Sequence, residues 1–553
     1  MSTESGSDRE PPAHSAGGLG QLVARCVLAV AVVTLVAADA EAVLSLRHDL
    51  EVEGFLEAKT AIRTPQFQGA DLVMQRNTVQ LEGRWEFLRS GNLFGFSTGR
   101  LEQGSLTVIN RNVYDSVYDV RGSYRERFSD EDRDRLRYEA NIREAYGEFL
   151  LPPVTLRLGR QQVVWGETDF FRALDVINPL DYRWHFYYEP FEDIRVPVSM
   201  VRGIYDIGKL PFLDEVFVEG IWIPGDYSPT KISLDPRRPW GFFGQGVRES
   251  ANTIIVGGEV FDFSTAVTND GPSFSLKNSE LAFRLKGLLG PVDFSLNYFW
   301  TISADAGPKV QQDLATVGPP ERSGSVGTVV LPVDLAYPRS HVVGLSANYA
   351  EEAFTQTVFR VESTYTTGVP VSLAADVPKA LDPDGNLYET SKRAVLMIGF
   401  DRPTWIKPLN QITTFFLSGQ LFWRHYLDFN RFFVGFPSVY PAELNGETLQ
   451  GRFVSRNTDR LTEDELAATF LATTSYGPGG LWRPTLLTAY DIVGTAGYTH
   501  LEIEHIYSAH LIFRLREAVF WGNNGEGPWF LGDRFGRPGD SRNETVFSIV
   551  FQF

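Results

Sequence analysis

The chain has 553 residues and a formal net charge of −18, with 43% hydrophobic and 13% aromatic residues. Strong acidity without basic clusters argues against a nucleic-acid-binding protein and against a polybasic surface for anionic lipid. The mean hydropathy of −0.14 is ordinary for a soluble protein, but the alternating strands of a membrane barrel give the same average.

The first element in the chain is an apolar run from Cys26 to Ala38. Arg25 precedes this run and Ala38-Asp39-Ala40 follows it, which is the order of a secretory signal peptide and its cleavage site. The run is shorter than the roughly 20 residues that a spanning helix needs. We therefore expect residues 1–40 to be a signal peptide cleaved near Ala40, with an uncleaved anchor as the alternative.

Alternation of apolar and polar residues, typical of strands, recurs through the rest of the chain. The clearest case begins at Val292, where Phe294, Leu296, Tyr298 and Trp300 share one face. Further candidate strands lie at 50–59, 79–87, 138–150, 154–164, 214–223, 279–287, 341–349, 354–366, 393–401, 410–423, 483–492 and 498–515. The segment 250–280 is consistent with either a strand or loop packing.

The end of the chain favours a barrel over a soluble β-sandwich, which alternates in the same way. Phe547, Ile549, Phe551 and Phe553 fall on one face of the last predicted strand. A final strand that ends in phenylalanine resembles the sorting signal of outer-membrane proteins, so Phe551 and Phe553 are expected to be read by the barrel-assembly machinery. The sequence predicts an all-β, transmembrane antiparallel β-barrel over residues 41–553, in the bacterial outer membrane.

The predicted connections alternate in length. Short turns are expected at 151–153, 287–291 and 351–353, and long connections over 165–196, 224–250, 303–338, 368–391 and 424–462. Short periplasmic turns and long extracellular loops are typical of outer-membrane barrels. We expect about 14–16 strands, with one loop, about 165–196, folded into the barrel.

The segment from Arg157 to Phe191 carries nine aromatic residues between Trp165 and Phe191, mixed with acids and bases. This segment resembles the proteobacterial outer-membrane barrel family catalogued as domain of unknown function 1302. The matching residues within it are Gly159-Arg160-Gln161, Trp165-Gly166-Glu167, Asp175, Asn178-Pro179 and Asp181. We expect this segment to form a constriction or plug. The alternative is that its ion pairs only anchor a loop to the wall.

The residues expected to line the lumen or to bind the cargo all lie in this segment, and most of them are polar or charged. They are Arg160, Gln161, Trp165, Gly166, Glu167, Asp169, Asn178, Asp181 and Arg183. Arg160 and Arg183 are expected to pair with Glu167, Asp169 or Asp181 inside the lumen.

The family resemblance implies a transport protein, and we expect neither catalytic residues nor cofactors. Its expected cargo is a hydrophobic or lipid-like small molecule, and its expected partners are outer-membrane lipid and lipopolysaccharide, a periplasmic carrier and an inner-membrane exporter. Two alternatives stay open: a passive porin for small hydrophilic solutes, and an outer-membrane enzyme or purely structural barrel. No sequence motif supports an enzyme.

Two clusters of side chains resemble metal sites. His500, Glu502 and Glu504 share one strand face, and Asp382, Asp384 and Asn386 are spaced as in part of a calcium loop that has no glutamate at its twelfth position. Both are better explained as solvated side chains, and no metal site is predicted.

Overall fold

A computed structural model describes residues 49–64, 70–93, 95–127, 130–183, 189–231, 253–256, 259–269, 271–310, 316–320, 325–373, 386, 388–434, 443–444, 447–448, 461–522 and 543–553. The predicted signal peptide, Asp382 and Asp384 lie outside these residues.

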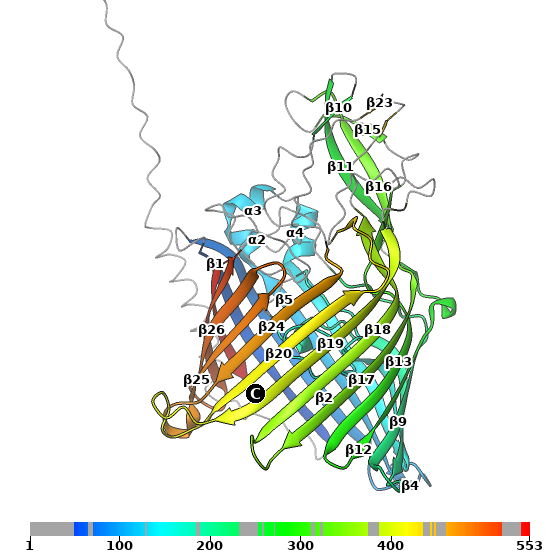
Figure 1. Cartoon of the computed structure of the whole chain (residues 1–553), viewed down its shortest axis with the longest axis vertical. Helices are drawn as coiled ribbons and strands as arrows, with labels where there is room; N and C mark the ends of the chain where they lie inside the picture. Colours follow the sequence, from blue (N-terminus) through cyan, green and yellow to red (C-terminus); the bar gives the residue numbers. More distant parts are fainter. Residues whose placement is uncertain are drawn as a thin grey trace, which may run out of the picture.

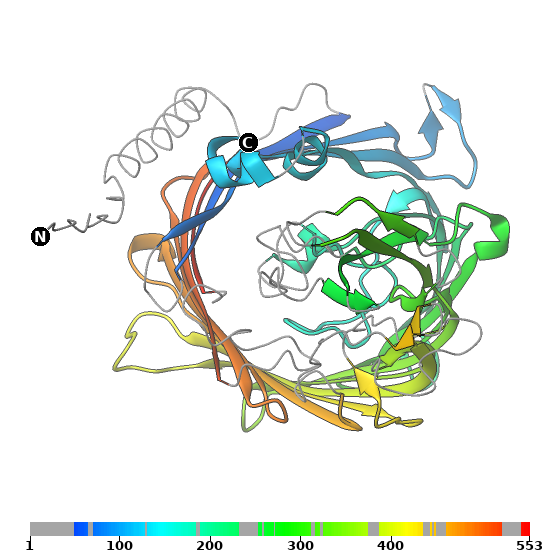
Figure 2. The same cartoon turned by 90° about the horizontal axis from the view of Figure 1, so that it is seen from above.

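The dominant structure is a closed antiparallel barrel of eighteen strands, seen end-on in Figure 2. Each strand pairs with the next barrel strand along the chain, and the last pairs with the first. The strands are β1 (Leu50–Arg63), β2 (Asp71–Leu88), β5 (Gln103–Asp115), β6 (Tyr138–Leu151), β7 (Val154–Gln161), β8 (Val198–Gly208), β9 (Asp214–Ile223), β12 (Glu280–Leu289), β13 (Val292–Ile302), β17 (Arg339–Glu351), β18 (Thr357–Leu373), β19 (Tyr388–Thr404), β20 (Phe415–Tyr426), β24 (Asp464–Thr473), β25 (Trp482–Asp491), β26 (Ala496–Ile506), β27 (Leu511–Gly522) and β28 (Glu544–Gln552). The short β21 (Phe433–Val434) pairs with the end of β18.

The predicted fold class is confirmed, but the expected strand number was too low. The sequence did not reveal β5, β8 and β24, and the single candidate at 498–515 is a hairpin of β26 and β27. Four residues, 507–510, connect these two strands.

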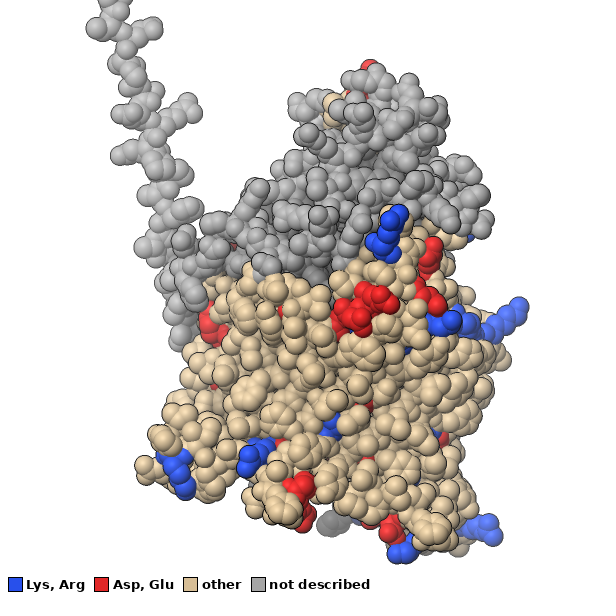
Figure 3. Space-filling view, in the orientation of Figure 1, with Lys and Arg blue, Asp and Glu red and all other residues tan. Residues whose placement is uncertain are grey.

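The barrel wall presents apolar side chains outward. Leu81, Leu296 and Phe400 are examples of large hydrophobic side chains exposed on the surface. Charged side chains are sparse across the middle of the wall visible in Figure 3. Because alternate residues of each strand face opposite sides, polar residues of the same strands face the lumen. This is the pattern of a membrane-spanning barrel. Among the described residues, no helix is both long and apolar enough to cross a bilayer.

The connections differ between the two ends of the barrel, as Figure 1 shows. Residues 152–153, 290–291 and 352–356 form short turns at what we call the short-turn end, as predicted. This end also carries the small hairpin of β3 (Asn92–Leu93) and β4 (Phe96–Ser97). The opposite, long-loop end carries α2 (Val117–Val120), α3 (Gly122–Arg127) and α4 (Asp130–Arg137) between β5 and β6.

A second sheet rises above the long-loop end (Figure 1). It contains β10 (Thr253–Val256), β11 (Glu259–Asn269), β14 (Gly307–Val310), β15 (Thr316–Gly318) and β16 (Thr328–Ala336), and β11 pairs with β16 in parallel. The segment at 250–280 therefore contributes strands outside the barrel. A separate two-stranded hairpin joins β22 (Glu443–Leu444) and β23 (Glu447–Thr448).

The connection between β7 and β8, residues 162–197, turns into the barrel and is called the inward loop below. It contains the short helix α5 (Phe191–Ile194). Seen from above, the ribbon of the inward loop lies inside the ring of strands (Figure 2). The predicted inward fold is confirmed.

Candidate functional site

The start of the inward loop is fixed by Trp165. Its indole Nε1 donates to Glu219 Oε2 at 3.1 Å, and Glu219, on β9, also pairs with Arg202 and Arg284. Around the indole lie apolar side chains that face the lumen from β8, β9, β12, β13 and β17, among them Met200. Trp165 is 4% exposed, so it anchors the loop to the wall and does not line an open passage.

Gly166 and Glu167 lie against β18. A Cβ on Gly166 would come within 2.8 Å of the Asp175 amide nitrogen and 3.0 Å of Glu362 Oε2. The glycine is thus required for close approach. The Glu362 carboxylate accepts hydrogen bonds from the backbone amides of Glu167 and Leu174. The Glu167 side chain accepts from Asn348 at 2.8 Å.

The Asp169 side chain attaches the inward loop to strands that are distant in the sequence. Its carboxylate accepts from Arg360 at 2.9 Å, Ser418 at 3.0 Å and Gln420 at 2.9 Å. Arg360 also pairs with Asp401 at 2.8 Å. Since β18 and β20 carry these partners, the loop crosses from β7 to a distant part of the wall.

Phe171 packs into the same distant wall. Its ring meets Phe422 edge to face at 5.4 Å, and the neighbouring Phe170 stacks on Tyr498 at 5.7 Å. The lumen-facing residues here include small and apolar side chains such as Ala467. The wall is therefore apolar where these rings pack, and the aromatic residues Trp165, Phe170 and Phe171 hold the loop in place together with its polar contacts.

Asn178 and Gln161 close the base of the loop. Asn178 Oδ1 accepts from the Val163 amide at 2.7 Å, and its Nδ2 donates to the Val196 carbonyl at 2.9 Å. Gln161 Nε2 donates weakly to Met200 O at 3.4 Å. Both side chains are fully buried, so their role here is to join the two ends of the loop.

The predicted pairings of the two arginines differ in outcome. Arg183 pairs with Asp181 at 2.6 Å, as expected. Arg160 has no carboxylate partner among the described residues; its Nε donates to the Arg143 carbonyl at 3.2 Å. The expectation for Arg160 was wrong because its guanidinium group lies against the backbone of β6, where that carbonyl is its acceptor.

A cavity remains between the inward loop and the wall formed by β1 and β26–β28. Its volume is about 730 Å³, and Glu53, Glu502, Glu504 and Arg516 are among its lining residues. A smaller cavity of about 80 Å³ shares Phe55, Glu57, Lys59, Glu189 and Asp193 with it. The shared residues place the two cavities side by side, and they are called the two parts of the cavity below.

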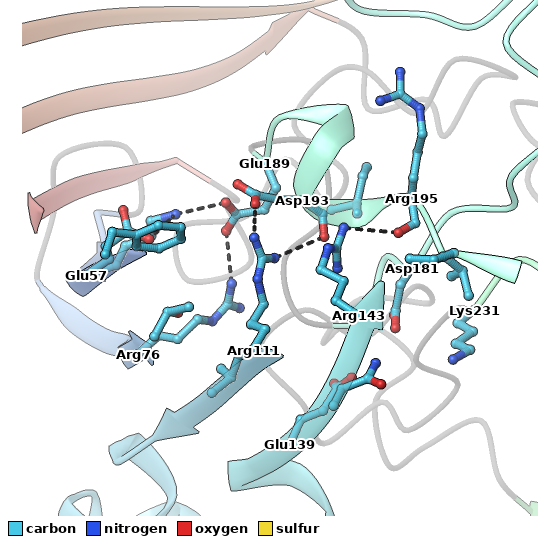
Figure 4. A pocket seen from close by; sticks show the side chains of 18 of the residues that line it. Glu57, Arg76, Arg111, Glu139, Arg143, Asp181, Glu189, Asp193, Arg195 and Lys231 are labelled. Atoms are coloured by element: carbon cyan, nitrogen blue, oxygen red, sulfur yellow. Dashed lines mark hydrogen bonds and ion pairs between the residues drawn. The ribbon is translucent and has the colours of Figure 1, made fainter. Parts of the chain in front are cut away.

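One wall of the smaller cavity is basic. Five neighbouring strands each contribute one basic side chain, in the half of the strand nearer the long-loop end: Lys59, Arg76, Arg111, Arg143 and Arg160, which we call the basic wall. Lys231, from the connection after β9, lies at the same cavity, as Figure 4 shows.

The inward loop faces the basic wall with acids. Glu189 accepts from Lys59 at 2.8 Å and Arg76 at 3.0 Å, and Asp193 pairs with Arg111. These contacts appear as dashed lines in Figure 4. The narrow part of the lumen thus lies between cations on the wall and carboxylates on the loop.

Sequence reasoning missed Glu189, Asp193 and the basic wall apart from Arg160. The sequence feature that could have revealed the basic wall is one basic residue at a lumen-facing position in each of five consecutive strands. One of these five strands, β5, was not predicted, so Arg111 was missing from the series.

The side chains of His500, Glu502 and Glu504, which share one strand face, are each bound to another residue. Glu502 pairs with Arg516 at 2.6 Å, Glu504 pairs with Arg514 at 2.9 Å, and His500 contacts the Tyr498 hydroxyl. Among the described residues, no group of histidine, cysteine, aspartate and glutamate is arranged to hold a metal ion.

The C-terminus completes the barrel. Phe553 and Gly54 exchange backbone hydrogen bonds of 2.9 and 3.0 Å, and Phe551 lies opposite Leu56 in the β1–β28 register. The rings of Phe551 and Phe553 stack at 6.1 Å. The two predicted assembly residues therefore sit at the seam between first and last strands.

The fold and the cavity define a transmembrane β-barrel with a lumen narrowed by an inward-folded loop. The chain belongs to the family described as "Protein of unknown function (DUF1302)", whose model matches residues 25–553. A comparison with curated protein sequences found no match.

Several solved structures of porins resemble the barrel. Acinetobacter baumannii OccAB1 is 9% identical, with 93% of this chain and 99% of that chain covered at a TM-score of 0.43. OccAB2 of the same organism is 12% identical, with 91% and 98% covered and a TM-score of 0.42. Salmonella typhi OmpF, in a complex with daunomycin, is 9% identical, with 91% and 97% covered and a TM-score of 0.38.

Proposed function

We propose that the protein is a non-enzymatic channel of the bacterial outer membrane that admits small hydrophilic solutes past the inward loop. The observation that carries this proposal is the lining of the cavity beside the loop. Glu57, Lys59, Glu189 and Asp193 belong to both of its parts. A passage lined with charged side chains favours solutes that keep their hydration, because burying an apolar molecule there would desolvate those charges.

The expected hydrophobic cargo receives less support from this geometry. It rested on an aromatic-rich constriction, but Trp165, Phe170 and Phe171 pack against the wall and line neither part of the cavity. The aromatic residues at 184 and 186–188 lie outside the described residues. The periplasmic carrier and the inner-membrane exporter stay predictions from the family resemblance.

The test is single-channel recording of the folded protein, lacking residues 1–40, in a planar lipid bilayer. Steady ohmic steps are expected. Silence from protein whose heat-shifted gel mobility shows a folded barrel would contradict the proposal. Swelling of proteoliposomes in a series of neutral sugars of increasing size then measures the width of the passage.

A further inference from the structure

The lining of the smaller cavity carries more basic than acidic side chains, whereas acidic side chains predominate in the larger cavity. Seven basic side chains line it against five acidic ones, although the whole chain has a net charge of −18. One of the seven, Arg195, is 4% exposed and pairs with Asp175 at 2.8 Å, so its charge is neutralised within the inward loop. The other six belong to the basic wall and to Lys231.

Three of these six are paired. Glu189 bridges Lys59 and Arg76 with its two carboxylate oxygens, and Asp193 holds Arg111. Charge-assisted hydrogen bonds between guanidinium groups and carboxylates are strong and geometrically selective. The basic wall thus already binds two carboxylates, both supplied by the inward loop.

The remaining three cations have no such partner among the described residues. Arg143 donates to the backbone carbonyls of Glu192 and Arg195, and Arg160 donates to the carbonyl of Arg143. Lys231 makes no ion pair in the described part of the chain. A carbonyl accepts a hydrogen bond but carries no formal negative charge. Asp181 and Glu139 also line this cavity, and both pair with Arg183.

Lys231 is partly buried beside charges of both signs. Burial lowers its pKa below the usual value, and Arg183 and Arg160 lower it further, against the opposing effect of Asp181 and Glu139. An anion bound at this place would favour the charged ammonium group.

We propose that Arg143, Arg160 and Lys231 form a binding site for the carboxylate group of a small anionic solute. The site lies beside Arg111, Arg76 and Lys59, where the carboxylates of Asp193 and Glu189 stand in for the same group. A solute carboxylate can therefore pass along the basic wall by exchange with the loop's own carboxylates. This inference rests on the proposed function, since it names the solute class of that channel.

The test is calorimetric titration of succinate into the full-length mature protein, folded in detergent, which requires no conduction. The variants Arg160→Gln and Lys231→Gln should each weaken succinate binding about tenfold, the effect of losing one hydrogen bond to a charged group. Lys209→Gln is the matched control: its side chain is exposed and pairs with Asp214 at 2.8 Å near the short-turn end, so binding should not change. Arg160→Lys should retain most of the affinity, which a merely structural role of Arg160 would not predict.

Equal binding by Arg160→Gln, Lys231→Gln and the control would overturn the site. Tighter binding of the dication putrescine than of succinate would overturn its charge preference, and tighter binding of inorganic phosphate would overturn its assignment to carboxylates. A barrel that binds succinate at these residues but is silent in a bilayer contradicts the proposed channel alone. A conducting barrel without this binding contradicts the site alone.

Discussion

Arg360 on β18 places its guanidinium 2.9 Å from the carboxylate of Asp169, 191 residues earlier in the chain. The pair joins the inward loop to a wall strand that lies far from the base of the loop. Asp169 also accepts from Ser418 and Gln420 on β20, so one side chain connects the loop to two strands.

We expect Asp169→Asn to loosen this attachment. The amide keeps some of the hydrogen bonds but loses the charge that pairs with Arg360, at a cost of about 1 kcal/mol for a partly exposed pair. Single-channel recordings should show more current noise and a larger mean conductance, because the loop moves away from the wall. Asp214→Asn, which breaks an exposed pair near the short-turn end, is the control. Quiet steps of unchanged size in Asp169→Asn would show that the pair does not hold the loop.

Asn178→Ala should destabilise the base of the inward loop. It leaves the amide of Val163 and the carbonyl of Val196 without their side-chain partner in a buried position. An unsatisfied buried group costs about 1–3 kcal/mol. Denaturant unfolding of the detergent-folded barrel, or faster protease cleavage within 162–197, measures this loss. A midpoint and a cleavage rate equal to those of the unmodified protein would refute it.

Removing the loop's carboxylates should increase the anion preference of the lumen. In the double variant Glu189→Gln, Asp193→Asn, the guanidinium groups of Arg76 and Arg111 lose their acidic partners. The reversal potential in a KCl gradient should shift toward the equilibrium potential of chloride, and succinate should bind more tightly. An unchanged reversal potential would place the ion path elsewhere in the lumen.

Succinate binding should weaken at alkaline pH. The pKa of Lys231 is lowered from 10.5, mainly by burial, so the positive charge of its side chain is lost as the pH rises through that lowered value. The loss therefore begins at a lower pH than for an exposed lysine. Titrations at about pH 7 and about pH 9.5 measure it, and Lys231→Gln should show no corresponding decline. Equal pH dependence in the two proteins would exclude Lys231 as the titrating group.

Deleting Phe553 should reduce assembly of the barrel in a Gram-negative host. The deletion removes the terminal backbone hydrogen bonds with Gly54 and the stacking with Phe551. The fraction of heat-shifted, membrane-inserted protein is the measurement. Phe547→Ala, which changes a 42% exposed side chain on the outer face of the same strand, is the control. Equal assembly of the two would argue against a terminal signal.

The sequence predicted the barrel and the inward loop but not all of the strands, for a physical reason. In β8, Val198 and Met200 face the lumen but are apolar because the inward loop covers them. In β24, Ala467 is buried beneath the same loop. Alternation disappears where the lumen face is dry. In β5 the interruption is on the outer face instead, where Asn110 and Asn112 hydrogen-bond to each other.

The candidate site was predicted only in part because its residues come from separate strands. The motif from Arg160 to Asp181 marked the loop, and its contacts are mostly anchors to the wall. The pairing of Arg76 with Glu189 depends on barrel closure and on the path of a loop 113 residues away. No local spacing in the sequence encodes such a contact.

In the proposed channel, solutes pass through the cavity beside the basic wall. The chain's one cysteine is Cys26, in the segment predicted to be removed, so single cysteines can be introduced. Thr78→Cys places a thiol in the cavity lining, and Val79→Cys places one on the opposite face of the same strand. Treatment with a charged, bulky methanethiosulfonate during single-channel recording should lower the conductance of Thr78→Cys in one step and leave Val79→Cys unchanged. Full conductance through a modified Thr78→Cys channel would contradict the claim.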